Sequence, residues 1–382
     1  MPKLYMNKEI ISIFLIASIG GLLWVQSYHN KTNIRLDENA GEYHVYPGGN
    51  IQEALEVAAR DANNKVIVVH TGTYRPNSAG QALLWFNSRH DGITLEADGE
   101  VILTAENPDI ADPDAPSYPA IVNHIVYFGD GISRSTIFRG FKITGAKDFV
   151  THAGSIEPSS ILEKGLFFYG DGGAMKIFGR SYPTIENVEI YGNSSSICGG
   201  GVSVEHGGYD NESVLFKNCI FRNNTTRITG AAIDLLPGSS AVIENCLFVG
   251  NVSNTGTNFV GPYNEEHGSG ALTVFFDSRA TVRNSTFTGN WAGVDDKGFG
   301  NIYENNIFWN NNKSGGTSRG ARYEIDILDG KNVKGNFISG KINDLRGTIN
   351  NAVNVFNPPP PDFDNNFVSR APEYDHVGYR GK

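Results

Sequence analysis

The sequence predicts an all-β protein, a parallel β-helix with three strands in each coil and a short helix capping its N-terminal end. Three observations support this: a repeated nine-residue core, an apolar alternation that changes phase inside the core, and 45 glycines in a chain also rich in Asn, Ser and Thr. These residue types favour turns over helix interiors. The cores are "IENVEIYGN" from residue 185, "FKNCIFRNN" from 216, "IENCLFVGN" from 243, "VRNSTFTGN" from 282 and "YENNIFWNN" from 303.

The N-terminal segment, residues 1–30, is predicted to be an export signal. Lys3 and Lys8 precede the apolar run "IISIFLIASIGGLLWV", which is the order found in signal sequences. The run is long for a signal and short for a membrane span, so a cleaved signal and an uncleaved anchor both remain open, and a buried helix is the weaker alternative. We expect the rest of the chain to lie outside the cytoplasm, periplasmic, secreted or anchored, with this segment as its only membrane contact.

Residues 50–64, "NIQEALEVAARDANN", predict the capping helix. Their apolar side chains fall on one helical face, and Asn50 can cap the first turn. A helix in this place covers the apolar floor and the unpaired edge of the first coil. The β-helix domain is expected to span residues 43–345.

Each repeat core is predicted to be two strands joined by a bend. Apolar residues alternate up to the central Asn245 and alternate again after it in the opposite phase, with Ile243 before it and Cys246 and Phe248 after it. Alternation is typical of a strand, and the change of phase indicates the bend. Asn and Gly adopt the left-handed backbone conformation most readily. The expected bend residues are Asn187, Asn218, Asn245, Asn284 and Asn305, with Gly140 and Gly335 in the same place.

A third strand precedes each core, after a small-residue turn, as in "GGAMKIFG" from residue 172 and "GAAIDLLPG" from residue 230. Three strands complete one coil, and coils stacked about 4.8 Å apart place equivalent residues in ladders. The outward residue before the bend alternates in charge, and we interpret this ladder as structural. It comprises Glu186, Lys217, Glu244, Arg283 and Glu304.

The remaining features limit the alternatives. Residues 346–382 contain four consecutive prolines and no periodicity, so we expect a tail outside the solenoid. Cys198, Cys219 and Cys246 have the spacing of neither a disulfide scaffold nor a zinc site, and the last two are expected to stack in the core. A net charge of -10 without a basic stripe argues against nucleic acid as a partner. We expect a monomer.

The "GGA" turns, the "NCxFxxN" cores and the Asn ladder resemble the right-handed parallel β-helix repeats of the pectin-lyase-like superfamily, which includes pectate lyases, polygalacturonases and alginate-processing enzymes. The resemblance implies a right-handed solenoid, in agreement with the general twist of strands. It also implies that a substrate lies along the outer face of one sheet. The motifs are specific for the fold and say little about activity.

If the third strand forms that face, its outward row is polar: Lys176, Ser203, Asp234, Thr273, Asp295 and Asp326. A solvated strand is expected to be polar, so each residue taken singly is more often solubilising than catalytic. Nearby aromatic residues and a long insertion favour a sugar chain as the ligand. We assign candidate catalytic roles to Lys176, Asp234, Arg180, His206 and His267, and candidate substrate contacts to Glu205, Arg279, Phe275 and Trp291.

Asp295 and Asp326 are expected on adjacent rungs, about 5 Å apart, where two carboxylates repel unless a cation or a proton intervenes. Calcium is the expected cation. Three functions remain open: a lyase or epimerase acting on an acidic polysaccharide, a polygalacturonase-like hydrolase, and a non-catalytic β-helix for glycan binding or adhesion. The hydrolase ranks behind the lyase because its usual "NTD" and "GHG" signatures are absent.

Overall fold

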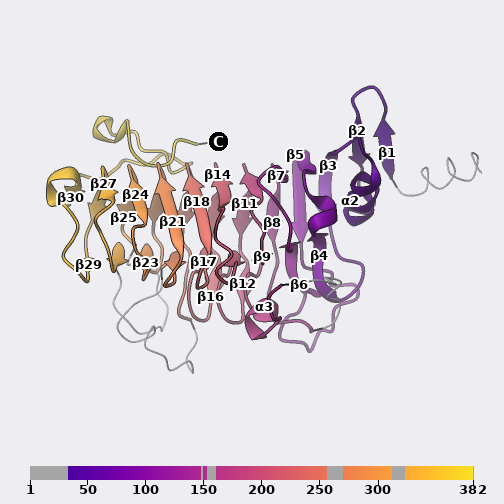
Figure 1. Cartoon of the computed structure of the whole chain (residues 1–382), viewed down its shortest axis with the longest axis horizontal. Helices are drawn as coiled ribbons and strands as arrows, with labels where there is room; N and C mark the ends of the chain where they lie inside the picture. The colour runs from indigo at the N-terminus through magenta and orange to yellow at the C-terminus, as the bar shows by residue number, and fades with distance from the viewer. Residues whose placement is uncertain (1–32, 148, 153–160, 256–269, 312–322, 382) are drawn as a thin grey trace, which may run out of the picture.

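The computed structural model describes residues 33–147, 149–152, 161–255, 270–311 and 323–381. These residues form a solenoid of stacked parallel strands (Figure 1). The N-terminal segment 1–30 and His267 lie outside the described residues. Among the helices that the structure describes, none has the length and apolar character of a membrane span.

One face of the solenoid is a nine-stranded sheet. Neighbouring strands of this sheet pair in parallel at equivalent positions, and each strand comes from the next coil along the chain. The strands are β4 (Gly80–Phe86), β6 (Val122–Phe128), β9 (Met175–Phe178), β13 (Val202–Glu205), β17 (Ile233–Leu235), β20 (Leu272–Val274), β23 (Val294–Asp296), β26 (Ile325–Ile327) and β29 (Ile342–Asp344).

The other two faces form a 19-stranded sheet that bends at the central residue of each core. The strands before the bend are β7 (Ile137–Arg139), β10 (Thr184–Glu186), β14 (Val214–Lys217), β18 (Ser240–Glu244), β21 (Arg279–Arg283), β24 (Ile302–Glu304) and β27 (Val333–Lys334). Those after it are β8 (Lys142–Thr144), β11 (Glu189–Tyr191), β15 (Ile220–Arg222), β19 (Leu247–Val249), β22 (Thr286–Thr288), β25 (Ile307–Trp309), β28 (Phe337–Ser339) and β30 (Val355–Phe356). Strand β30 pairs with β28, so the last coil runs past the boundary expected at residue 345.

The N-terminal end is closed by an antiparallel strand pair and a helix. Strand β1 (Ile34–Asp37) pairs with β2 (Glu42–Val45), and the long strands β3 (Val66–Tyr74) and β5 (Thr94–Thr104) continue the stack. Helix α2 (Ile51–Arg60) buries one apolar face on the first coil, and the Asn50 side chain accepts a hydrogen bond from the Glu53 N–H. The expected capping helix is therefore confirmed in a shorter form.

The bend residues have the predicted left-handed backbone. The φ angles are 56° at Asn187, 55° at Asn218, 51° at Asn245, 49° at Asn284 and 55° at Asn305. Gly140 and Gly335 have φ angles of 85° and 68°. Gly recurs there because it has no Cβ to clash with the backbone in this conformation, and Asn because its short polar side chain can offset the clash by a local hydrogen bond.

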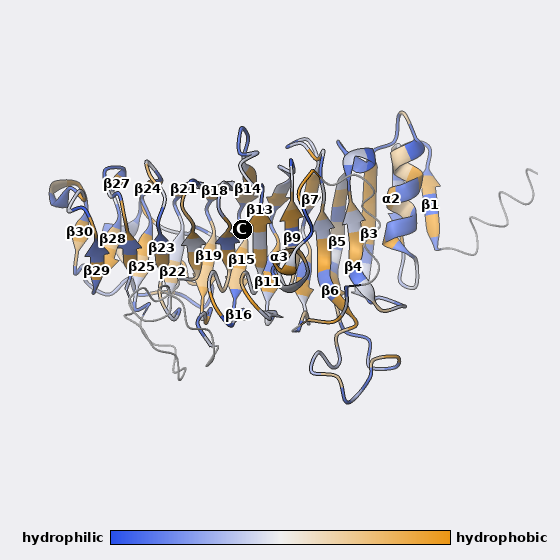
Figure 2. Ribbon diagram, turned by 60° about the horizontal axis from the view of Figure 1, so that its bottom comes forward, coloured by the Kyte–Doolittle hydropathy of each residue, from blue (hydrophilic) through white to orange (hydrophobic). Residues whose placement is uncertain are grey.

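Apolar side chains stack along the solenoid interior, and Figure 2 shows the apolar colour concentrated in the strands. The rings of Phe221, Phe248, Phe287 and Phe308 lie 4.9, 4.2 and 5.0 Å apart in succession. All three cysteines are buried and free of disulfides. The Cys219 N–H lies 3.4 Å from Cys246 Sγ, as expected for residues stacked on adjacent rungs.

The C-terminal segment lies along the outside of the strands that follow the bend (Figure 1). Tyr374 and Val377 pack against Ile307 and Phe337. The Arg380 N–H donates to Asn245 Oδ1 at 2.8 Å. The described residues also form helix α3 (Leu166–Gly170), three short 3-10 helices and two short strands: η1 (Ser88–His90), η2 (Asn351–Val353), η3 (Pro372–Tyr374), β12 (Ser194–Ser195) and β16 (Thr225–Thr226).

Candidate functional site

The polar row predicted on the third strand of each coil exists as a ladder on the nine-stranded sheet. The register pairs its members from strand to strand, in the order Lys176, Ser203, Asp234, Thr273, Asp295 and Asp326. We call these six residues the polar row. Each of them is at most 1% exposed. The expectation that this row is solvated is therefore wrong, although its geometry is as predicted.

Part of the burial comes from helix α3 (Leu166–Gly170), which lies against the outer face of the sheet. Its Phe168 packs with Trp85, Tyr127 and Phe178 of neighbouring strands. This second apolar layer excludes water from the N-terminal end of the polar row.

Lys176 is fully buried under this layer. Its Nζ forms an ion pair with Glu205 at 2.7 Å and donates to Phe167 O at 3.1 Å and to Ser203 Oγ at 3.2 Å. These three contacts match the three N–H donors of an ammonium group. Lys176 is therefore a buried structural cation in this structure and not the exposed base that we expected.

Asp295 and Asp326 face each other on adjacent strands, as predicted. Lys297 Nζ lies 2.8 Å from Asp295 and 3.4 Å from Asp326, and the attraction of both carboxylates raises the pKa of Lys297. A lysine thus supplies the positive charge that we had assigned to calcium. The repulsion argument no longer requires a metal ion at this pair.

Asp171, Cys198 and Asp234 form a second buried group, which we call the Asp–Cys–Asp cluster. One ligand atom of each lies within 4.8 Å of the other two. Burial raises the pKa of Asp234 to about 7 and that of Asp171 well above its ordinary value. Burial also raises the pKa of the Cys198 thiol.

His206 and Trp291 have no access to a substrate. His206 is buried, with Nε2 donating to Ser181 O at 2.9 Å and Nδ1 accepting from the Ser240 N–H at 3.2 Å. Burial lowers its pKa to about 4, so the ring is neutral at pH 7. Trp291 is fully buried. The burial of both side chains disagrees with the exposed positions that the predicted roles need.

Arg180, Arg279 and Phe275 lie nearer the surface. Arg180 makes a two-pronged contact with Asp130, at 3.0 Å from Nε and 2.7 Å from Nη2, and Arg279 pairs with Asp210 at 3.2 Å. Both are about half exposed. Phe275 is partly buried. The structure does not bring these three side chains together with Lys176 in one open site.

Some residues of the buried region were missed at the sequence level. His124 accepts at Nε2 from Gln81 and donates from Nδ1 to Gly172 O at 2.8 Å, and burial lowers its pKa to about 4. Asp171 and Cys198 stand five residues before Lys176 and Ser203, in the equivalent place of successive repeats. Aligning the turns as well as the strands would have placed Asp171 and Cys198 in one ladder.

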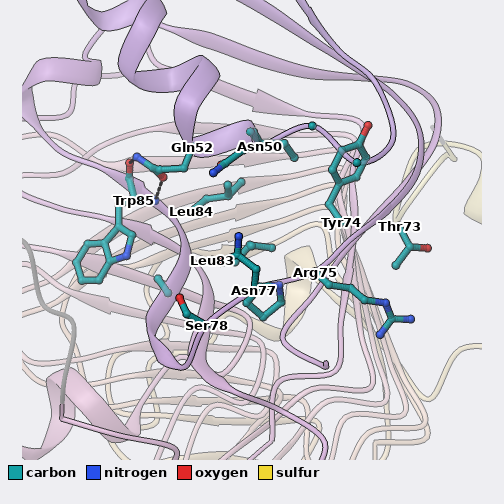
Figure 3. Close-up of a pocket in the computed structure, with 15 residues that line it drawn as sticks. Asn50, Gln52, Thr73, Tyr74, Arg75, Asn77, Ser78, Leu83, Leu84 and Trp85 are labelled. Carbon is teal, nitrogen blue, oxygen red and sulfur yellow. Dashed lines mark hydrogen bonds between the residues drawn. The ribbon is translucent and has the colours of Figure 1, made fainter. Parts of the chain in front are cut away.

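The structure also has an open cleft, between the first turn of α2 and the β3–β4 connection (Figure 3). Its volume is about 400 Å³. Gln52 ties its walls together by accepting from the Trp85 N–H at 2.7 Å and donating to Trp85 O at 3.2 Å. The other polar groups come from Asn50, Thr73, Tyr74, Arg75, Asn77 and Ser78. No Asp, Glu, His, Lys or Cys lines the cleft within the described part of the chain.

The three-sided stack, the left-handed bends and the parallel register define a parallel β-helix. Residues 131–269 match the family model described as the right handed beta helix region, which confirms the expected fold. No curated protein and no solved structure matches the chain.

Proposed function

We propose that this protein is an exported β-helix that binds an acidic glycan without cleaving it, in the cleft between α2 and the β3–β4 connection. The observation that supports binding over catalysis is the separation of the two regions. The cleft has polar groups and no acid–base pair, whereas the predicted acid–base residues Lys176 and Asp234 are fully buried. Hydroxyl, amide and aromatic groups are the usual lining of a sugar site.

The preference for an acidic sugar comes from the charge of the cleft. Arg75 stands at its rim, where Nη1 donates to Glu106 O at 3.1 Å and leaves other N–H groups of the guanidinium for a carboxylate (Figure 3). The first turn of α2 adds the positive end of a helix dipole. The whole chain carries a net charge of -10, so affinity for an anion must come from the local positive field of Arg75 and the first turn of α2.

Titration calorimetry with uronic acid oligosaccharides tests the proposal, with the same oligosaccharides reduced at the carboxyl group as matched ligands. We expect binding of the acidic forms and several-fold weaker binding by Arg75→Gln, because an exposed ion pair contributes about 0.2–1 kcal/mol. Arg134→Gln is the control, since Arg134 is exposed and lies outside the cleft lining. Equal affinity for the reduced and acidic oligosaccharides, or none for either, would reject the proposal.

A lyase or epimerase acting on an acidic polysaccharide is the second candidate. It is favoured by the raised pKa of Asp171 and Asp234 near Lys176, since perturbed groups gather at functional sites. Unsaturated products that absorb in the ultraviolet would support the lyase, and inverted uronate residues the epimerase. Loss of that activity in Asp234→Asn would locate the functional site on the nine-stranded sheet rather than in the cleft.

Export rests on the apolar run that follows Lys3 and Lys8. Residues 1–35 fused to a reporter that matures only outside the cytoplasm should give activity. The same fusion with Lys3 and Lys8 kept and the apolar run interrupted by two Asp residues is the control. Activity that is absent from the first fusion, or equal in both, would contradict export by this segment.

A further inference from the structure

The Asp–Cys–Asp cluster is built from three successive coils, with Asp171 and Cys198 at equivalent positions in two turns and Asp234 on the strand of the third coil. Asp171 follows α3, Cys198 stands in the turn before β13, and Asp234 is the middle residue of β17. Their exposed fractions are 0, 2 and 0%. Three ionisable side chains therefore converge in a place that water does not reach.

The contacts within the cluster leave several oxygen atoms without a well-formed hydrogen bond. The Cys198 N–H donates to Asp171 Oδ1 at 2.9 Å, and the Thr229 hydroxyl donates to Cys198 Sγ at 3.1 Å. Burial raises the pKa of Asp234, while the neighbouring Thr229 hydroxyl and Cys198 thiol act to lower it; the Thr229 proton is directed at Cys198 Sγ. Asp171 Oδ2 and both carboxylate oxygens of Asp234 have no well-formed hydrogen bond among the described residues. A buried carboxylate in this state requires a proton or a cation.

Lys176 does not supply that cation. Its three donors are directed at Glu205, Phe167 O and Ser203, so the Lys176–Glu205 pair is already neutral. The positive charge near Asp171 and Asp234 is a neighbour and not a ligand. This differs from Asp295 and Asp326, which Lys297 bridges directly.

The backbone beside the cluster keeps space for the carboxylate. Gly230 has φ of 63°, and a Cβ on it would lie 2.6 Å from Asp234 Oδ1 and 2.5 Å from Asp234 Cβ. Any larger residue would push this carboxylate away from Asp171 and Cys198. The left-handed turn thus holds the three side chains together.

We propose that Asp171, Cys198 and Asp234 bind a divalent transition metal ion, with Zn²⁺ as the best fit. A sulfur ligand beside two carboxylates suits Zn²⁺ better than Ca²⁺ or Mg²⁺, which take oxygen ligands alone. Zinc bonds of about 2.0–2.3 Å place tetrahedral ligand atoms roughly 3.5 Å apart. The three atoms, now within 4.8 Å of one another, would therefore close by at most about 1.3 Å on binding.

The site lies outside the glycan cleft and does not depend on the proposed function. Cys198 binds as a thiolate, so the ion displaces a proton from each of the three ligands, and two carboxylates and one thiolate around a 2+ ion leave the site with one net negative charge. Bound metal would join three successive coils through their side chains, in addition to the backbone ladder. Its direct effect would be on the stability of this part of the solenoid.

The test uses the full chain after dialysis against a chelator, with Zn²⁺ in a competition titration and Co²⁺ as a spectroscopic probe. We expect one Zn²⁺ per chain and, with Co²⁺, a thiolate-to-metal charge-transfer band. Asp234→Asn and Cys198→Ser should each weaken Zn²⁺ binding by more than the roughly 10–100-fold typical of losing an outer-shell partner. Cys198→Ser should also remove the band.

Two matched variants serve as controls. Cys246→Ser replaces another buried free thiol, and Asp295→Asn replaces another buried carboxylate. Both should bind Zn²⁺ as the unmodified chain does. A chelator-treated chain that stays folded and takes up no Zn²⁺ would overturn the proposal, as would a band that survives in Cys198→Ser and disappears in Cys246→Ser. Should Cys198→Ser fail to fold, the band in the unmodified chain and in Cys246→Ser still decides the outcome.

Discussion

Two ladders of side chains face away from the solenoid interior, and they differ in how far they are exposed to solvent. On strands before the bend, Glu186, Lys217, Arg283, Glu304 and Lys334 pair between rungs at 2.6–3.4 Å near the surface. On the nine-stranded sheet, the polar row lies under further structure and is at most 1% exposed. Pointing out of a coil is therefore not the same as facing solvent.

The difference changes what each charge contributes. A surface ion pair gains little, because water solvates both partners well and salt screens them. A buried charge needs a partner, because its desolvation is costly when it stands alone. The exposed ladder should therefore tolerate substitution, and the polar row should not.

The largest effect is expected for Lys176→Ala. It leaves Glu205 without its cation and Ser203 and Phe167 O without their donor, so we expect a loss of about 3–5 kcal/mol in the free energy of unfolding. Urea denaturation measures this, with Lys217→Ala on the exposed ladder as the matched control at about 1 kcal/mol or less. Equal losses in the two variants would remove the distinction between the ladders.

The next effect is a pH dependence carried by Asp234. Its pKa is raised by burial from 3.8 to about 7, so between these values the folded state binds more protons than the unfolded state. Stability of the metal-free chain should then fall as pH rises through this window, by on the order of 4 kcal/mol at 1.36 kcal/mol per pKa unit. Asp234→Asn should flatten the profile. A metal-free chain that gains stability from pH 4 to 7, with the variant showing the same gain, would contradict the assignment.

The fold could be predicted because its signals repeat. The bend at Asn245 and its counterparts, the strand alternation and the ladder partners are local patterns that recur in each coil, and the φ angles confirm them. The site could not be predicted in the same way. The burial of Lys176 depends on α3, a helix of five residues from an inserted segment, and no periodicity reveals where such a segment packs.

A second ladder of Asn was also missed, although its residues end the same repeat cores. Asn224, Asn251 and Asn290 are buried, and each donates from Nδ2 to the Oδ1 of the next rung, as Asn251 does to Asn290 at 2.9 Å. The ladder continues to Asn311, which donates to Glu324. Sequence alone does not separate a bend Asn from a buried Asn, because both recur with the same period.

A moderate effect is expected at the bend itself. Asn245→Val forces a β-branched residue into φ of 51° and removes the bonds to Asn218 Oδ1 and to the Arg380 N–H. We expect a loss of about 1–3 kcal/mol in the free energy of unfolding. Asn245→Gly keeps the backbone conformation and loses only the side-chain bonds, so it should lose less. A larger loss for Gly than for Val would show that backbone strain is not the main cause.

The smallest effect is expected on the exposed ladder, at Glu304. Its carboxylate contacts Lys334 at 2.6 Å and Arg283 at 2.7 Å, and these two hydrogen bonds lower its pKa below the ordinary 4.5. Because the folded pKa is depressed, this stabilisation is present above pH 4.5 and is lost as pH falls through the folded pKa. Glu304→Gln should therefore lose about 1 kcal/mol or less at neutral pH, and high salt should narrow the gap to the unmodified chain, because exposed pairs are screened. Lys176→Ala should keep more of its loss in the same salt, since the Lys176 side chain and the Glu205 oxygen that it contacts are buried, although the Glu205 side chain as a whole is 21% exposed. If salt reduced the losses in unfolding free energy of Glu304→Gln and Lys176→Ala equally, the polar row would have to be as accessible to solvent as the exposed ladder. The contrast between the two ladders would then be lost.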